Sequence, residues 1–267
     1  MQKLLLGFLL AALIALIAYR FRSLSRSGAW GALATGTLIF GLGGWQWAVV
    51  LMAFFVSSSL LTRLFGRRKA GLNEKFEKGG QRDLGQVLAN GGIASLFALL
   101  SAIFPASSWT WAGFAASLAA VNADTWATEL GVLSPSLPRM VTNGKLVEKG
   151  TSGAISSIGT LAALGGAAFI ALWAVLFSPF ASSSGSLTDF VRISLSGLVG
   201  ALFDSFLGAT LQGIYRCPKC DKETEHHPLH SCGTQTLQIR GQKWLNNDLV
   251  NLACALCATL FVILVWR

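Results

Sequence analysis

Two carboxylates, Asp124 and Glu129, interrupt an apolar stretch that runs from about residue 109 to residue 133 and is long enough to cross a bilayer. An ionised carboxylate at the centre of a membrane helix costs roughly 2.5–3.5 kcal/mol on insertion scales, so it usually faces protein or water and serves a function. Five residues apart on a helix, the two acids point about 140° away from each other. We expect a ligand site here; the alternative is that a neighbouring hydroxyl group or arginine satisfies each acid.

Further oxygen donors stand in or beside two later apolar stretches: Asp204, Asn247, Asp248 and Asn251. Mg²⁺ prefers such hard oxygen ligands and usually binds through a few carboxylates together with substrate phosphates. We therefore predict that Asp124 and Asp204 hold Mg²⁺, with Glu129 as a further candidate ligand. Asparagine is also a favourable helix cap, so Asn246 and Asn247 equally fit the start of the last helix.

A basic loop precedes the sixth apolar stretch, and its candidate anion-binding residues are Lys145, Lys149, Gly150, Thr151 and Ser152. Backbone amides at a helix start, together with hydroxyl groups and a lysine, form a ready anion site. The segment is not a Walker A motif, because no GxxxxGK[ST] pattern occurs in the chain. The other interpretation is a Ser/Thr-rich helix cap beside a lysine that sets the membrane topology.

Three further residues, Asn90, Gly91 and Gly92, lie inside the fourth apolar stretch. Each glycine in a helix costs about 1 kcal/mol relative to alanine, so the pair often marks a helix break or a close approach to a ligand. Asn90 can hydrogen-bond a ligand. The alternative for all three residues is packing between helices.

A cysteine-rich segment within residues 214–247 has the pattern Cys-x2-Cys followed by His-x-Cys, and its candidate ligands are Cys217, Cys220, His230 and Cys232. Tetrahedral Zn²⁺ takes four such ligands, and Cys-x2-Cys is a common half-site. We predict a structural zinc, because all four positions would be filled. His226 or His227 can substitute for His230, and free thiols are the alternative. We expect this segment to be separate from the intramembrane acids.

The overall composition excludes an ordinary soluble protein. Hydrophobic residues make up 53% of the 267 residues and charged residues only 12%, compared with about 25% in soluble domains. We count eight apolar stretches near the ~20 residues that cross a bilayer: 3–19, 28–43, 46–62, 84–104, 109–133, 153–178, 188–213 and 248–266. We predict one all-α, polytopic membrane bundle over residues 1–267, whose short second span is either transmembrane or re-entrant.

The positive charge, formally +9, is segregated along the chain. Eighteen of the 21 lysine and arginine residues fall in or at the edges of loops 20–27, 63–83, 134–152 and 214–247, which eight spans place on one side of the membrane. By the positive-inside rule that side is cytoplasmic, and both termini lie outside. The basic residues therefore mark membrane topology, and we expect no nucleic-acid partner.

Several motifs resemble a known integral-membrane family, the one that contains plant and cyanobacterial phytyl-phosphate kinase and an uncharacterised transmembrane protein of animals. The segments that carry the resemblance are 86–92 (QVLANGG), 123–131 (ADTWATELG), 148–156 (EKGTSGAIS) and 245–251 (LNNDLVN). The likeness covers essentially the whole chain. CTP-dependent phytol and dolichol kinases and phosphatidate cytidylyltransferase share a more distant pattern: Asp124, Ala127 and Gly131, then Lys149, Gly150 and Thr151.

The resemblance implies a membrane kinase with its active site on the cytoplasmic side. It would move a phosphoryl group from a nucleoside triphosphate, with CTP as the expected donor, to phytyl, geranylgeranyl or farnesyl phosphate. Together with the patterns above, it implies catalytic roles for Asp124, Glu129, Lys149 and Asp204. The residues expected to bind nucleotide or phosphate are Asn90, Gly91, Gly92, Asn122, Lys145, Gly150, Thr151, Ser152, Asn247, Asp248 and Asn251.

Two other functions stay open from the sequence. Acids and glycines inside the spans also suit an ion-coupled transporter. A cytidylyltransferase that forms a CDP-lipid would use the same kind of metal and phosphate site. The sequence is also compatible with an oligomer in the lipid bilayer.

Overall fold

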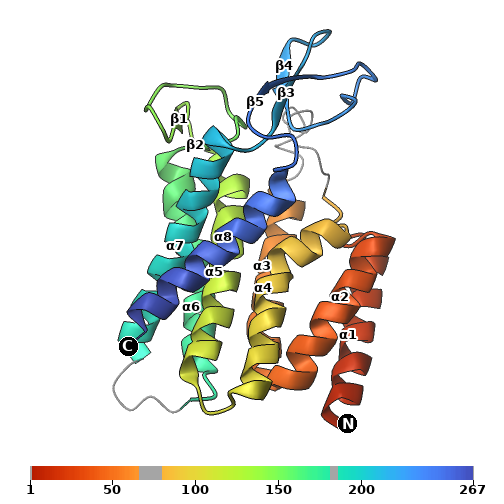
Figure 1. Ribbon diagram of the computed structural model, residues 1–267, viewed down its shortest axis with the longest axis vertical. Helices are drawn as coiled ribbons and strands as arrows, with labels where there is room; N and C mark the ends of the chain where they lie inside the picture. Colours follow the sequence, from red (N-terminus) through yellow and green to blue (C-terminus); the bar gives the residue numbers. More distant parts are fainter. Residues whose placement is uncertain (1, 66–79, 181–185, 267) are drawn as a thin grey trace.

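The computed structural model describes residues 2–65, 80–180 and 186–266, which form an α-helical bundle with small β-sheets at one end (Figure 1). Its α-helices are α1 (Gln2–Arg20), α2 (Arg26–Leu38), α3 (Trp45–Phe65), α4 (Leu84–Ile103), α5 (Ser108–Gly131), α6 (Ser157–Leu176), α7 (Ser186–Thr210) and α8 (Asn247–Val265). Six of them, α1, α3, α4, α6, α7 and α8, are long and apolar enough to cross a membrane. The predicted class, an all-α membrane bundle, is confirmed.

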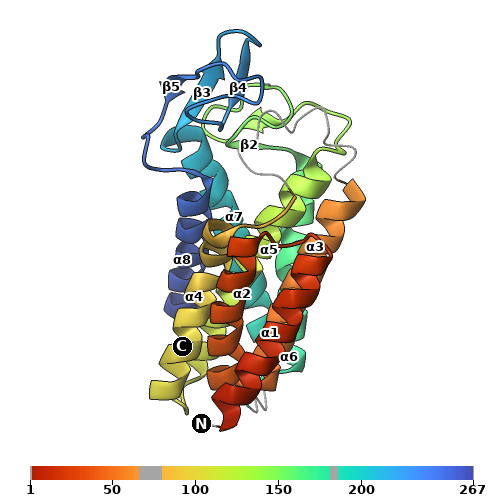
Figure 2. The ribbon, with the colours of Figure 1, turned by 90° about the vertical axis from the view of Figure 1, so that its right-hand side faces the viewer.

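The short second span crosses the bundle and does not turn back. Helix α2 continues directly into η1 (Ile39–Gly43), a π-helical turn, and the combined element runs beside α1 (Figure 2). At its far end Gly41 meets the first turns of α1: a Cβ on Gly7 would lie 2.6 Å from the Gly41 nitrogen. The glycines that shorten this span in sequence thus allow two helices to approach closely.

Helix α5 is the centre of the bundle. It contacts α3, α4, α6, α7 and α8, and its residues from Thr110 to Ala123 are buried without interruption. Many of them are alanine, which lets the surrounding helices approach closely. Trp111 and Phe114 pack against Trp47 of α3 with ring centroids 5.2 and 4.4 Å away. Because protein surrounds it, α5 can carry polar residues that a lipid-facing helix could not.

Helix α4 runs unbroken through Gly91 and Gly92, so the glycine pair does not mark a helix break. Gly91 packs near Thr35 of α2, whereas a Cβ on Gly92 would meet nothing within 4 Å. The helix begins with a capping box, in which the Asp83 and Gln86 side chains each accept a hydrogen bond from the other residue's backbone N–H.

The described loops that carry basic residues lie at one end of the bundle, and both ends of the chain lie at the other (Figure 1). We call the first the loop end and the second the terminal end. This arrangement agrees with the predicted segregation of charge. Five of the basic residues behind that prediction fall outside the described residues: Arg67, Arg68, Lys69, Lys75 and Lys78.

Two small antiparallel sheets cover the loop end. Strands β1 (Arg139–Met140) and β2 (Ala154–Ile155) pair between α5 and α6. Strands β3 (Ile214–Cys217), β4 (Lys222–Thr224) and β5 (Leu237–Arg240) form a sheet in the order β4-β3-β5 between α7 and α8. Residues 214–240 are thus a folded β-structure, which we call the ribbon.

Candidate active site

Asp124 and Asp204 are brought together by the packing of α5 against α7. The two helices run in the same direction, from the terminal end toward the loop end (Figure 1). A Cβ on Gly200 of α7 would lie 2.7 Å from the Cβ of Ala120 on α5. One turn further along each helix are Asp204 and Asp124, roughly 9–11 Å inside the loop ends of their helices. Their carboxylates lie close enough to interact electrostatically.

A third carboxylate, Glu225, joins the pair from the ribbon. It also interacts electrostatically with Asp204, and its Oε1 accepts a 3.0 Å hydrogen bond from Nε2 of Gln212. The Oδ2 atom of Asp204 is buried and has no hydrogen-bond partner among the described residues. A buried carboxylate oxygen without a donor, beside two more acids, is a typical setting for a divalent cation. We call Asp124, Asp204 and Glu225 the carboxylate cluster.

The predicted anion loop packs beside this cluster. Gly153 has a φ of +82°, which favours glycine, and a Cβ there would lie 2.2 Å from the backbone of α7. Ser152 Oγ donates a 2.8 Å hydrogen bond to Oε1 of Gln212, the residue that also bonds Glu225. The loop therefore lies against the end of α7, about one turn beyond Asp204.

The two lysines of this loop take different positions. Lys149 Nζ donates hydrogen bonds to the carbonyl oxygens of Val132, at 3.2 Å, and Ser134, just beyond the C-terminal end of α5. A cation is favourable there because helix carbonyls point toward it. The next residue, Gly150, has a φ of +79°. Lys145 is exposed between β1 and β2, and no contact among the described residues joins it to the carboxylate cluster.

Glu129 belongs to a different cluster, on another side of α5 from Asp124. It is buried, and its Oε1 accepts a 3.1 Å hydrogen bond from Thr62 of α3. It also interacts electrostatically with Arg82. A hydroxyl group and an arginine thus accompany this acid, as one of the two interpretations of the sequence had it. The expected sharing of one metal by Glu129 and Asp124 finds no support in these contacts.

Arg82 stands immediately before the α4 cap. Its guanidinium donates a 2.8 Å hydrogen bond to Ser58 Oγ and lies over the rings of Phe54 and Phe55, all on α3. Burial lowers the pKa of Arg82 to about 10, so the group keeps its charge at neutral pH. Asn90 lines a hollow beside Arg82 and is not among the residues around the carboxylate cluster.

Asn122 is engaged within the bundle. Its Oδ1 accepts a 3.1 Å hydrogen bond from Ser57 of α3, and its Nδ2 donates a 2.8 Å hydrogen bond to the carbonyl oxygen of Gly166 on α6. These bonds tie three helices together just below Asp124. They support a structural role for Asn122. Both polar atoms of its side chain already have partners within the bundle, which does not favour the nucleotide-binding role predicted for it.

The start of α8 combines a cap with acidic and amide side chains. Asn246 caps the helix by accepting a 3.1 Å hydrogen bond from the backbone N–H three residues later, which confirms the capping interpretation for this residue. Asn247, Asp248 and Asn251 follow in the first turns, and Oδ1 of Asp248 is buried. Further along, Cys254 interacts electrostatically with both aspartates of the carboxylate cluster, so α8 borders the site.

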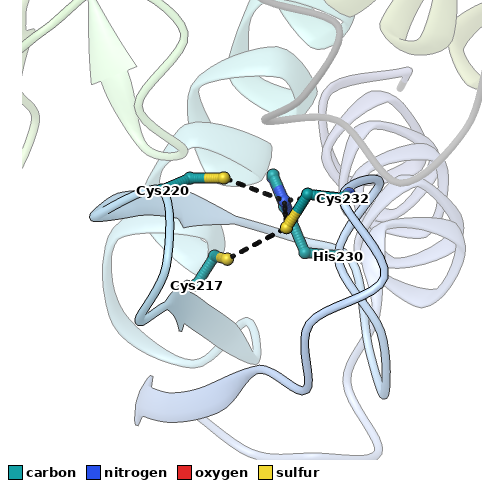
Figure 3. A group of neighbouring side chains, drawn as sticks. All are labelled: Cys217, Cys220, His230 and Cys232. Atoms are coloured by element: carbon teal, nitrogen blue, oxygen red, sulfur yellow. Dashed lines mark hydrogen bonds between the residues drawn. The ribbon is translucent and has the colours of Figure 1, made fainter.

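The ribbon brings together the four predicted metal ligands (Figure 3). One atom from each of Cys217, Cys220, His230 and Cys232 lies within 4.8 Å of every other. The Cys217 and Cys232 sulfurs are 3.6 Å apart, and His230 Nδ1 is 3.7 Å from the Cys220 sulfur and 3.2 Å from that of Cys232. Ligand atoms placed about 2.3 Å from Zn²⁺ at tetrahedral corners are about 3.8 Å apart. The cluster can hold a metal ion of this size.

Two turns present these ligands. Cys217 ends β3 and Cys220 lies in the β3–β4 turn, where Asp221 donates its backbone N–H to the Cys217 carbonyl. Hydrogen bonds from Thr234 and His230 lower the pKa of the Cys232 thiol to about 5, whereas its bond to Cys232 raises the pKa of Cys220 to about 11.

The ribbon contacts the segments that carry the intramembrane acids, so it is not spatially separate from them as we expected. Arg240 of β5 donates 2.8 and 2.9 Å hydrogen bonds to the carbonyl oxygens of Ala209 and Ser152. Together with the Gln212–Glu225 bond, these contacts fasten the ribbon to the end of α7 and to the anion loop. The Cys/His cluster thus supports a segment that supplies one carboxylate of the site.

Sequence reasoning missed three of the residues described here. Glu225 and Gln212 could not be identified from the sequence, because Glu225 reaches Asp204 through the docking of the ribbon and Gln212 meets Ser152 through the packing of the anion loop on α7. The sequence does contain a local indication of the position of Arg82. Asp83 and Gln86 have the spacing of a capping box, which predicts that a helix starts there and that Arg82 immediately precedes it.

Comparison with known proteins identifies the family. Residues 9–259 match the integral membrane protein family DUF92. The chain belongs to this family. Similar proteins include Protein PGR of Arabidopsis thaliana (33% identical; 93% of this chain and 91% of the relative aligned) and an uncharacterized membrane protein of Methanocaldococcus jannaschii (35% identical; 79% of this chain and 84% of the relative aligned). Chloroplastic Protein VTE6 of Arabidopsis thaliana is 26% identical over 85% of this chain and 61% of its own length. No solved structure matches.

Proposed function

We propose that this DUF92 protein is a membrane kinase that transfers a phosphoryl group from a nucleoside triphosphate, preferentially CTP, to an isoprenyl monophosphate. One observation carries the proposal: a buried, unsatisfied oxygen of Asp204 lies beside two more carboxylates and a glycine-rich loop, near one end of a membrane bundle. A metal–nucleotide complex needs acids and backbone amides in this combination. The resemblance of several motifs to phytyl-phosphate kinase supports the substrate class.

The donor nucleotide would bind between the carboxylate cluster and the anion loop. Asp124, Asp204 and Glu225 would hold Mg²⁺, which when bound neutralises phosphate charge and aligns the reacting groups. Backbone N–H groups of residues 150–153 would bind phosphate oxygens, since two glycines there permit close approach. Lys149 would position the loop by anchoring it to the end of α5.

The acceptor would supply its own nucleophile. The second pKa of a phosphate monoester is about 6, so at neutral pH the acceptor is largely a dianion and attacks without a protein base. A bond forms between its oxygen and the γ-phosphorus as the bond from that phosphorus to the β,γ-bridging oxygen breaks. The products are an isoprenyl diphosphate and a nucleoside diphosphate. Positioning and charge neutralisation are the contributions that such a transfer requires of the protein.

Labelled nucleotide tests this reaction and separates it from the alternatives. Purified protein is given geranylgeranyl phosphate, Mg²⁺ and CTP or ATP labelled in either the α- or the γ-phosphate. A kinase moves only the γ-label into the lipid product. Transfer of the α-label would instead identify a cytidylyltransferase. Absence of transfer from both nucleotides would overturn the proposal and leave an ion-coupled transporter as the better hypothesis.

The active site would face the cytoplasm. The positive-inside rule places the loop end there and both termini outside. In intact cells, an impermeant maleimide should react with Ala106→Cys at the terminal end but with Asn143→Cys at the loop end only after the cells are opened. The wild-type protein sets the background from its own cysteines. The reverse pattern would contradict this orientation.

We also propose that the Cys/His cluster binds Zn²⁺ in a structural role. Three thiolates and one imidazole nitrogen fill all four tetrahedral positions, which leaves no open position for a substrate. Elemental analysis of the purified protein should find about one zinc per chain. A protein folded without any bound metal would contradict this assignment.

A further inference from the structure

An apolar hollow lies between helices α1, α2, α3 and α4; its enclosed space is about 70 Å³, and with the space open to the surroundings it measures about 630 Å³. Its walls include Ala15 of α1, Phe40 of η1, Leu51 and Phe55 of α3, and Val87 of α4. Helix α1 packs extensively on α2 and η1 but not, among the described helices, on α3. The hollow therefore lies between α1 and α3, both of which contribute residues to its walls. Because most of its space is open, a lipid chain would occupy it as an open groove rather than as an enclosed cavity.

The end of this hollow is cationic. Arg82 lines it together with Asn90 and also lines a second hollow, of about 370 Å³, at the loop end. Arg22 and Arg63 are in the wall of that second hollow. Arg82 thus stands where an apolar space inside the bundle meets a space lined by three guanidinium groups. Arginine at such a junction favours an anion, and phosphate above all, because its planar fork of donors matches phosphate oxygens.

We infer that the acceptor lipid binds here, with its isoprenyl chain in the hollow between α1 and α4 and its phosphate at Arg82. This inference rests on the proposed kinase function and names the place of its second substrate. A phosphate monoester carries about −1.5 to −2 charges at neutral pH, which complements the three arginines. The proposed reaction uses a single-tailed lipid, so we expect such a lipid to be favoured over a two-chain phospholipid.

The same placement explains how the acceptor reaches the donor. Glu129, which interacts with Arg82, and Asp124, in the carboxylate cluster, are five residues apart on α5. At 1.5 Å per residue this is a rise of about 7.5 Å. The central helix therefore separates an acceptor side, toward α1 and α3, from a donor side, toward α7. The head group would approach the carboxylate cluster from the loop end.

A photoreactive lipid tests the position of the chain without requiring turnover. Geranylgeranyl monophosphate with a diazirine at the end of its tail is bound to the full-length protein in detergent without nucleotide, and the labelled peptides are identified by mass spectrometry. We expect adducts on α1–α4. Ala15→Phe, which fills the hollow, should reduce labelling roughly tenfold, while Leu16→Phe, on the exposed side of the same helix, should not. Labelling confined to α5–α8, or equal effects of the two variants, would overturn the inference.

A second comparison tests the head group. Arg82→Gln should weaken competition by unlabelled geranylgeranyl phosphate by about tenfold or more, as expected for the loss of a charge-assisted pair, but should change competition by geranylgeraniol little. A loss of equal size for both competitors would mean that Arg82 only supports the fold, and would overturn its role. Equal competition by two-chain phosphatidic acid would overturn the single-chain assignment. Correct labelling without phosphoryl transfer would reject the kinase proposal and leave the lipid site in place.

Discussion

The two halves of the bundle are packed differently. Between α5, α6, α7 and α8, glycine and alanine bring the helices into direct contact: a Cβ on Gly197 or Gly200 would lie under 3 Å from a neighbouring alanine Cβ. Between α1, α3 and α4, small residues such as Ala15 and Gly91 instead line an open hollow. The presence of small residues alone does not determine whether neighbouring helices pack tightly or leave a hollow between them.

The proposed sites for donor and acceptor account for this difference. Carboxylates that share a metal must stay at fixed distances, and close helix contact one turn below them provides that rigidity. A flexible lipid chain needs volume and an apolar wall, with few polar contacts. On these grounds we assign the donor to the dense half and the acceptor to the open half. The following predictions test that division.

The largest effect is expected from Asp204→Asn. The variant keeps the size of the side chain but removes the charge beside Asp124, so we expect kinase turnover to fall at least about a hundredfold. Folding should be unchanged or easier, because a buried charge is removed. The matched control is Asp189→Asn on the same helix, where the acid pairs with Arg192 at 3.7 Å near the terminal end. Equal turnover in the two variants would break the assignment of the donor site.

Loss of the ribbon metal should have the next largest effect. Replacing Cys217 and Cys220 by serine removes two ligands, and such small units depend on metal binding for much of their folding free energy. Because Glu225 and Arg240 connect the ribbon to the donor site, we expect turnover per folded molecule to drop about tenfold or more. Zinc content, turnover and thermal unfolding are measured together. Full activity in a zinc-free, folded protein would show that the ribbon does not support the site.

A pair of glycines compares the packing of the two halves directly. Gly200→Ala places a methyl group 2.7 Å from Ala120, and such overpacking typically destabilises by about 1–3 kcal/mol. Gly91→Ala, in the wall of the hollow, places a methyl group 3.9 Å from Thr35, an ordinary contact, and in a helix it should stabilise by up to about 1 kcal/mol. Reversible unfolding in detergent gives both values. The same sign for both variants would contradict the difference in packing.

The smallest effect is expected from Lys149→Met. The lysine caps the end of α5, and a cation at that position contributes about 0.3–1 kcal/mol. We expect a small loss of stability and little change in the KM for CTP. A large rise in that KM would show that Lys149 contacts the nucleotide directly, as the sequence-based assignment of a catalytic lysine had it.

Local features of the fold were predictable because each rests on a contiguous pattern. Apolar stretches predicted the helices, because a membrane span can be identified from its length and apolar composition. The Cys-x2-Cys and His-x-Cys spacings predicted the four clustered ligands, because short turns fix the distance between neighbours. The glycine-rich second span was harder to interpret: the same composition suits a re-entrant segment and a close helix contact, and the contact of Gly41 with α1 decided between them.

The sequence by itself determined that this is a membrane bundle with basic loops at one end and with acids that lipid could not accommodate. Tertiary structure alone decided how those acids are grouped. Asp124 pairs with Asp204 because Ala120 and Gly200 touch one turn earlier, and Glu225 joins them because the ribbon docks on α7. The physical reason is that helical periodicity shows which residues share one face of a helix. Which other helix packs against that face depends on contacts between segments that are far apart in the chain.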